Sequence, residues 1–219
     1  MLKPVSPAAL LFDMDGVIVN STPLHVQSWK IYLGLQGIDA TDIERRMLGL
    51  RNEELVGQLF GEHLTWEERT RHGEAKEALY RELMAPVLEA HLVPGLREFL
   101  TLHAATPMAV VSNAERANID FVLDEARLRP YFRVIVDGTQ VVRPKPFPDS
   151  YLKAAEMLQA DPGDCVVFED SEAGITAGLA AGARVVGLKT TLSAIPQAHL
   201  AVDDFTSVEL AEMFVSTAG

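Results

Sequence analysis

The stretch AALLFDMDGVIVNS, Ala8–Ser21, decides how the rest of the chain is interpreted. It begins with the apolar run 8–12, which is short and uninterrupted, as is typical of a strand buried on both faces of a sheet. Asp13 follows the run directly, and Asp15 and Gly16 come soon after it. The sequence therefore predicts a buried strand that places two carboxylates at its carboxyl end.

Similar apolar runs recur in the second half of the chain, and each of them ends in polar residues. They cover 108–111, 133–136, 165–168 and 184–188. Stretches with helical patterning lie between them, at 95–102, 115–125, 149–158 and 172–181. Alternating buried strands and helices are typical of a parallel, doubly wound sheet, which binds ligands at the carboxyl ends of its strands. We therefore expect an α/β fold with a Rossmann-like core.

The interval 20–93 interrupts this alternation, because it lacks buried-strand runs and carries helical patterning. Thr65 and Glu68 have the spacing of a capping box, which predicts the start of a long helix. A proline and a glycine at 94–95 mark the return to the sheet. The predicted organisation is an all-helical cap domain, 20–93, inserted into a catalytic core domain made of residues 1–19 and 94–219.

The composition is that of a globular protein with a core of ordinary size, since 48% of the 219 residues are hydrophobic. The net charge is -12 and Lys and Arg are not clustered, so we expect no nucleic-acid partner. Cys165 is the only cysteine, the first residues lack a signal-peptide pattern, and no apolar run approaches the roughly 20 residues of a membrane-spanning helix. We expect a soluble cytoplasmic protein without membrane partners, as a monomer or homodimer.

Asp13 and Asp15 form a pair that is suited to catalysis, because in an extended chain both side chains point into one crevice. One carboxylate can attack phosphorus, while the other protonates the leaving oxygen and later takes a proton from water. The alternative is a plain turn, since Asp and Gly are favoured in turns. On these residues alone both interpretations stay open.

Two further polar segments carry candidate binding groups. Ser112 and Asn113 follow the run 108–111, where a hydroxyl and a backbone N–H can hold phosphoryl oxygens, although a helix N-cap explains the serine equally well. Lys145 lies in RPKPFPD, 143–149, whose prolines stiffen the backbone that presents the cation. An isolated surface lysine would simply be solvated. The rigid loop favours a role in binding anionic groups.

Glu169 and Asp170 form an acidic pair directly after the apolar run 165–168. Carboxylate oxygens are hard ligands of the kind that Mg²⁺ prefers. Because the carboxyl ends of parallel strands bind ligands together, the pair belongs to the same candidate site as the first two aspartates.

The segment FDMDGVIVNS, 12–21, resembles the first signature of the haloacid dehalogenase-like superfamily of phosphatases and mutases. Three more segments resemble its further signatures in the same order: VVSN at 110–113, RPKPFPD at 143–149 and VVFEDSEAG at 166–174. The resemblance implies the catalytic residues Asp13, Asp15, Ser112 and Lys145. It also implies a Mg²⁺ cofactor held by the Asp13 carboxylate, the Asp15 backbone carbonyl, Asp170 and, directly or through water, Glu169.

The segment NSTPLHVQSW, 20–29, resembles the branch of that superfamily containing β-phosphoglucomutase and related sugar phosphatases, in which the cap acts as a lid. This resemblance implies the substrate-binding residues Ser21, His25, Gly49, Arg51 and Lys76 in the cap, together with Asn113 in the core. Two of them have alternative interpretations: His25 as a packed helix residue, and Lys76 as part of a solvated helix face with Glu partners.

Together these residues predict a Mg²⁺-dependent phosphatase that hydrolyses a small phosphorylated metabolite, a sugar phosphate, through an aspartyl-phosphate on Asp13. A phosphomutase of the β-phosphoglucomutase type is the alternative, because it would use the same core residues. A catalytically silent metabolite-binding protein is a third candidate. Such a protein would usually have lost Asp13, Asp15 or Lys145, and all three are present.

Overall fold

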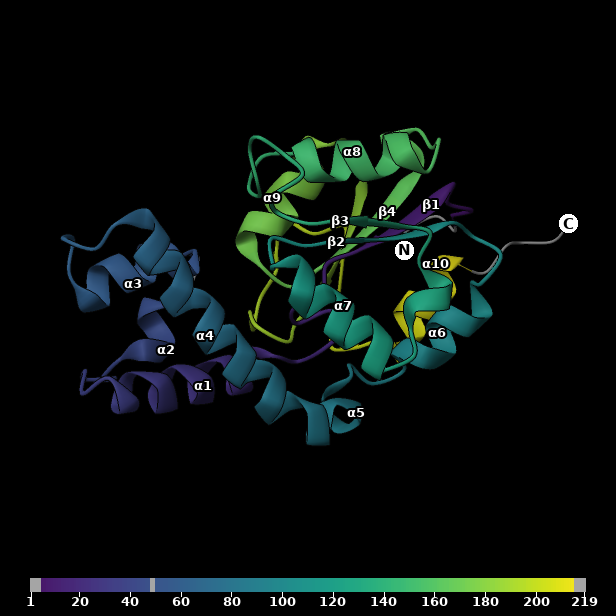
Figure 1. Ribbon diagram of the computed structural model, residues 1–219. Coiled ribbons are helices and arrows are strands. Elements are labelled where there is room, and N and C mark those ends of the chain that lie inside the picture. Colours follow the sequence, from purple (N-terminus) through teal and green to yellow (C-terminus); the bar gives the residue numbers. More distant parts are fainter. Residues whose placement is uncertain (1–4, 48–49, 215–219) are drawn as a thin grey trace, which may run out of the picture. The chain divides into compact units, whose positions relative to one another are not determined.

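The computed structural model describes residues 5–47 and 50–214, and its sheet consists of parallel strands (Figure 1). The strands are β1 (Ala9–Phe12), β2 (Met108–Val111), β3 (Val134–Val136), β4 (Cys165–Glu169), β5 (Arg184–Leu188) and β6 (Leu200–Val202). The first five match the predicted apolar runs. The strand β6 was not predicted, because it is only 3 residues long and half-buried over its first two, so its apolar signal is weak.

The order of the strands, β3-β2-β1-β4-β5-β6, places β1 in the middle of the sheet. Phe12, the last residue of β1, lies opposite Val110 of β2 and Phe168 of β4. The residues that follow these strands therefore emerge at one edge, where the strand order reverses and doubly wound sheets bind their ligands. The prediction of a parallel, doubly wound α/β core is confirmed.

Helices cover both faces of the sheet (Figure 1). One face carries α8 (Asp149–Met157) and α9 (Glu172–Ala180), and the other carries α6 (Leu96–Leu102), α7 (Arg116–Glu125) and α10 (Val208–Phe214). Successive side chains of a strand point to opposite faces of the sheet. Leu11 therefore packs in the apolar cluster on the face that α8 and α9 cover. Phe12 stacks on Phe168 and meets Phe99 of α6 edge-on. In the described part of the chain, no helix is both long and apolar enough to cross a membrane.

Residues Ser21–Leu88 form a second compact unit. Its helices are α1 (Thr22–Leu35), α2 (Ile43–Arg46), α3 (Asn52–Phe60) and α4 (Trp66–Met84), and its core includes Trp29, Leu33 and Ile43. The predicted capping box is confirmed, because the Thr65 N–H donates to Glu68 Oε2 at 2.8 Å and the Glu68 N–H donates to Thr65 Oγ1 at 3.3 Å. This unit is therefore helical throughout its described elements.

The short helix α5 (Leu88–His91) leads from this helical unit back to the sheet unit. Residues 89–93, which lie inside the predicted range of the cap, group with the sheet unit. There the Val93 N–H donates to Ile18 O at 3.1 Å, which holds the returning chain beside the segment after β1. Short 3-10 turns complete the described elements: η1 (Ala85–Val87), η2 (Arg129–Tyr131) and η3 (Pro162–Asp164).

Candidate active site

The aspartate turn begins directly at the end of β1. The Asp13 N–H donates to Phe168 O at 3.0 Å, so strand pairing continues to the aspartate. The chain then bends at residue 14 and turns over 16–18, so it does not stay extended through Asp15 as the sequence argument assumed. Gly16 has a φ of 76°, and a Cβ there would lie 1.8 Å from Asp170 Oδ2. The turn alternative is therefore correct for this segment, and the turn packs closely against Asp170. The catalytic role of the aspartate pair stays a prediction.

Lys145 is buried, and its ammonium donates to three acceptors. Nζ lies 2.6 Å from Asp13 Oδ1, 2.6 Å from Glu169 Oε1 and 2.8 Å from Val111 O. An ammonium has three protons, so these contacts use all of them and fix its position. Burial alone would lower the pKa of Lys145, but the Asp13 and Glu169 carboxylates outweigh burial and raise the pKa to about 12. The lysine is therefore a charged partner of Asp13 and not a solvated surface residue.

The loop that carries Lys145 is tied to α8. Arg143 donates to Asp149 at the start of the helix, from Nε at 3.1 Å and from Nη2 at 2.9 Å. Lys153 Nζ, further along α8, donates to Gln140 O at 2.7 Å. The loop is therefore held on both sides of Lys145, in addition to the stiffness that its prolines provide.

Glu169 is the last residue of β4, and its carboxylate is enclosed by protein donors. Oε2 accepts from the Asp170 N–H at 3.1 Å, the Ser171 N–H at 3.3 Å and Ser171 Oγ at 3.1 Å. A Cβ on Gly174 of α9 would lie 1.7 Å from Glu169 Oε1, so the carboxylate occupies the space that this glycine leaves open. Glycine at 174 is thus a requirement of the site.

Two threonines after β5, Thr190 and Thr191, join the aspartate turn to the acidic pair. Thr191 Oγ1 donates to Asp170 Oδ2, and Thr190 Oγ1 donates to Gly16 O at 2.6 Å. Neither threonine was predicted to belong to the site. The signal was available, since they follow a buried strand of the same sheet as the other polar groups do.

The three acidic side chains fit a divalent cation. Asp13, Glu169 and Asp170 each offer a carboxylate oxygen, and these oxygens lie within 4.8 Å of one another. Burial raises the pKa of Asp13 well above its usual range, against the opposing effect of Lys145. Burial and the neighbouring Glu169 raise the pKa of Asp170 to about 7. A bound cation relieves this crowding of buried negative charge, and hard oxygen ligands suit Mg²⁺.

Asp15 and the end of β2 border the same cluster. Asp15 lies two residues beyond Asp13 in the chain, and its charge adds to the raised pKa of Asp13. Lys145 binds the carbonyl of Val111, so the next residue, Ser112, follows directly beside the ammonium. Ser112 is buried and Asn113 follows it. The helix N-cap alternative for the serine is wrong, because the N-cap of α7 is Glu115.

His25 and Lys76 lie in contact within the helical unit. Lys76 Nζ is 2.7 Å from His25 Nδ1 and 2.8 Å from Glu77 Oε1, which also accepts from Asn52 Nδ2 at 2.7 Å. Lys76 is only 1% exposed, so the solvated-face alternative is wrong. The His25 ring stacks on Tyr80 with centroids 3.9 Å apart. Because an ammonium can only donate, His25 Nδ1 accepts, and its neutral ring carries the proton on Nε2.

The remaining predicted cap residues lie at helix starts or outside the described residues. Ser21 is buried, precedes α1, and accepts at its carbonyl from the His25 N–H at 3.0 Å. Arg51 is exposed and precedes α3. Gly49 lies outside the described residues. These side chains belong to the helical unit, whereas the cluster around Asp13 belongs to the sheet unit.

Glu77 makes the helical unit sensitive to acid. Burial alone would raise its pKa, but the Lys76 ammonium and the hydrogen bonds from Lys76 and Asn52 outweigh burial and lower the pKa from 4.5 to about 2. A carboxyl with a lower pKa in the folded state stabilises the fold above pH 4.5, and this contribution is lost as the pH falls towards 2. We expect Glu77→Gln to lower the free energy of unfolding at neutral pH by on the order of 3 kcal/mol. The deficit relative to wild type should shrink below pH 4.5.

Urea unfolding of both proteins across this pH range measures the deficit. Glu89→Gln is the matched control, because Glu89 also pairs with a cation, Arg97, but is itself exposed. The control should change the free energy of unfolding by less than about 1 kcal/mol. A deficit of the same size at neutral and acidic pH would show that the charge of Glu77 does not stabilise the fold.

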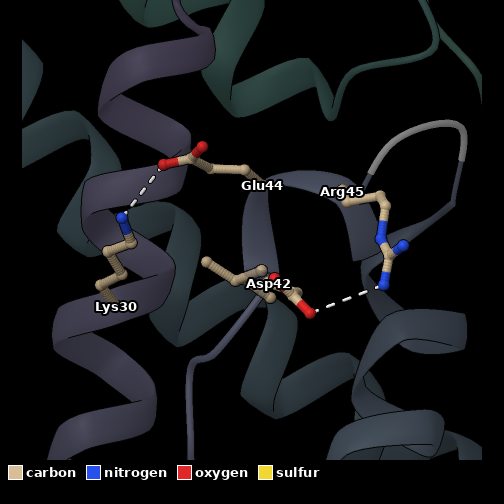
Figure 2. A pocket seen from close by; sticks show the side chains of 5 residues that line it. Lys30, Asp42, Glu44 and Arg45 are labelled. Carbon is tan, nitrogen blue, oxygen red and sulfur yellow. Dashed lines mark hydrogen bonds and ion pairs between the residues drawn. The ribbon is translucent and has the colours of Figure 1, made fainter.

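A pocket of about 380 Å³ lies in the helical unit, and its lining residues are Lys30, Asp42, Ile43, Glu44 and Arg45 (Figure 2). Its charged side chains pair with each other: Lys30 Nζ lies 3.1 Å from Glu44 Oε1, and Arg45 Nη2 lies 3.5 Å from Asp42 Oδ2 (Figure 2). None of the lining residues is a predicted site residue. The candidate active site is therefore the cluster around Asp13 and not this pocket.

The chain resembles known proteins over most of its length. Residues 7–182 match the family model of the haloacid dehalogenase-like hydrolases, a range that includes the helical unit and much of the sheet unit. The chain is 34% identical over 187 residues to the fructose-1-phosphate phosphatase YqaB of Escherichia coli, across 83% of this chain and 96% of that protein. It is 31% identical over 191 residues to the β-phosphoglucomutase of Bacillus subtilis, across 82% of each. A β-phosphoglucomutase structure from Clostridium difficile has a TM-score of 0.80 at 26% identity, across 94% of this chain and 96% of that one.

Proposed function

Because the chain belongs to the haloacid dehalogenase-like hydrolase family, we propose that it is a Mg²⁺-dependent phosphatase of a small phosphorylated metabolite, with Asp13 as nucleophile. Its relatives show that the protein is a phosphatase or a phosphomutase. YqaB and the phosphorylated carbohydrates phosphatase of Thermotoga maritima, which is 31% identical over 193 residues, support a sugar phosphate as substrate.

The contact between Asp13 and Lys145 carries this proposal. The Asp13 carboxylate lies at the carboxyl end of β1, with the ammonium 2.6 Å from its Oδ1. A buried carboxylate without a cation would hold its proton and could not attack phosphorus. The ammonium favours the ionised form of Asp13, and it offsets the charge of a phosphoryl group bound beside it.

In the proposed reaction, an Asp13 carboxylate oxygen bonds to phosphorus while the bond from phosphorus to the sugar oxygen breaks. Asp15 gives its proton to that departing oxygen. Asp15 then takes a proton from water, whose oxygen attacks phosphorus, releases phosphate and restores the Asp13 carboxylate. Ser112 and Asn113 bind phosphoryl oxygens in both steps.

We infer that the Asp13 and Asp170 carboxylates and the Asp15 backbone carbonyl hold Mg²⁺, with Glu169 beside it as a direct ligand or through water. When bound, the ion neutralises charge on the transferring phosphoryl group. The protein's own part is to keep the acidic groups in place. The threonine hydroxyls after β5 do this for Asp170 and for the aspartate turn.

In the helical unit, we propose that the substrate's sugar is recognised by Ser21, His25, Gly49, Arg51 and Lys76. His25 is oriented for this role, because Lys76 occupies its Nδ1 and leaves a proton on Nε2. An N–H donor of that kind suits a sugar hydroxyl or a phosphate oxygen. By closing as a lid, the unit would exclude water and complete the site.

A phosphomutase is the second candidate, and the identity of 31% to the β-phosphoglucomutase of Bacillus subtilis favours it. The two functions use the same core residues. They differ in whether water or a second sugar hydroxyl reaches the phosphorylated Asp13.

A panel assay distinguishes the two candidates. The purified protein is incubated with Mg²⁺ and a set of sugar phosphates, and free phosphate and positional isomers are recorded separately. We expect phosphate release from at least one member and none without a divalent cation. Isomerisation of β-glucose 1-phosphate without phosphate release would replace the phosphatase by the mutase.

A further inference from the structure

Tyr151 of α8 has a polar end in apolar surroundings. The side chain is 0% exposed and belongs to the apolar cluster between the sheet and the helices α8 and α9. Its hydroxyl donates to Glu169 Oε1 at 2.7 Å. A phenylalanine would suit the apolar neighbours equally well, and a buried hydroxyl is unfavourable unless it is hydrogen-bonded. The hydroxyl therefore has one evident purpose, which is its contact with Glu169.

That contact completes the set of donors around Glu169. Oε1 accepts from Lys145 and Tyr151, and Oε2 accepts from the Asp170 N–H, the Ser171 N–H and the Ser171 hydroxyl. Oε1 has two lone pairs, and Lys145 and Tyr151 occupy both, while the other donors hold Oε2. Glu169 is consequently fixed in orientation.

The fixed carboxylate in turn sets the position of Lys145. The ammonium donates one hydrogen bond to Glu169, one to Val111 O and one to Asp13 Oδ1. The ring of Tyr151 lies beside it, with its centroid 4.8 Å from Nζ. If Oε1 had a vacant lone pair, it would offer Lys145 Nζ a second acceptor direction, in competition with Asp13.

We propose that Tyr151 is a positioning residue of the phosphoryl-transfer site, which keeps Glu169 oriented so that Lys145 stays in contact with Asp13. The proposal rests on the proposed function, and it adds a residue that the four signature segments do not contain. Tyr151 acts through Glu169 and Lys145 and touches no reacting atom. Its loss should therefore slow the chemical step more than it weakens binding of substrate.

Tyr151→Phe tests the proposal, with Tyr131→Phe as the matched control. Tyr131 also makes one hydroxyl contact, to Thr101 Oγ1 at 2.9 Å, but this contact is exposed and lies outside the site. With para-nitrophenyl phosphate and Mg²⁺, we expect kcat of Tyr151→Phe to fall about tenfold and KM to change less than about twofold. The control should match wild type in both.

Crystal structures of wild type and Tyr151→Phe supply a readout that does not depend on turnover. We expect the separation of Lys145 Nζ and Asp13 Oδ1 to lengthen from 2.6 Å in the variant. An unchanged separation with unchanged kcat would overturn the proposal, and so would a general loss of thermal stability with kcat and KM altered alike, which marks a purely structural role. If wild type hydrolyses no substrate, the proposed function fails, and the two crystal structures still decide the role of Tyr151.

Discussion

Asp13→Asn is expected to reduce phosphate release from a sugar phosphate by on the order of 10³-fold or more. The amide has nearly the shape of the carboxylate but is a far weaker nucleophile, so the covalent step is lost. The fold should survive, because Lys145 keeps its contacts with Glu169 and Val111 O. Phosphate release under saturating Mg²⁺, together with the urea midpoint of unfolding, measures both outcomes.

Asp203→Asn is the matched control for this substitution. Asp203 also pairs with a lysine, Lys189, at 3.0 Å, but its side chain is 85% exposed. The control should keep wild-type turnover, since an exposed pair contributes little. Mass spectrometry after rapid quenching adds a direct test, because wild type should gain a phosphoryl group that Asp13→Asn lacks. A variant with normal turnover would refute covalent catalysis through Asp13.

Sequence predicts the central part of this fold well, because each of its inner strands is buried on both faces. The run 8–12 and the run 165–168 are continuous and apolar, and they form the neighbouring strands β1 and β4. The edge strand β6 gives no such signal, since two of its residues are half-buried. The local path of the backbone is harder to predict. Around Asp15 the chain bends and turns, although the spacing of the two aspartates suggested an extended strand.

Site residues, like strands, could be predicted where the local sequence pattern determines their position. Asp13, Lys145, Glu169 and Asp170 were predicted because they occupy strand ends or a stiff loop, and the structure brings them together. Their roles in catalysis stay a prediction. Tyr151 could not be found in this way, because it lies on the buried face of an amphipathic helix and its role depends on how α8 packs on the sheet.

The contacts of the predicted cap residues could not be predicted from the sequence either. The spacing of Lys76 and Glu77 along α4 looks like an exposed charged stretch, yet both are buried. Their burial depends on contacts with His25 and Asn52, which lie on other helices. A local pattern reports the charge of a side chain, but the three-dimensional packing of helices decides whether that charge meets water or a partner.

Lys145→Met should be nearly as damaging as the loss of the nucleophile, for an electrostatic reason. Methionine fills similar space but removes the cation that lowers the pKa of Asp13, which burial and the carboxylates of Glu169, Asp170 and Asp15 already raise. More of Asp13 would then be protonated at neutral pH, and the transferring phosphoryl group would lose its ammonium partner. We expect kcat/KM for a sugar phosphate to fall on the order of 10²–10³-fold.

Mg²⁺ binding separates this explanation from simple damage to the site. Without the ammonium, the remaining carboxylates attract a divalent cation at least as strongly, so calorimetry should show Mg²⁺ affinity kept or increased in Lys145→Met while activity is lost. Lys30→Met is the control, because Lys30 pairs with Glu44 at an exposed position of the helical unit and should leave both quantities unchanged. Loss of Mg²⁺ binding together with activity would mean that Lys145 only holds the site together, whereas full activity would remove it from the mechanism.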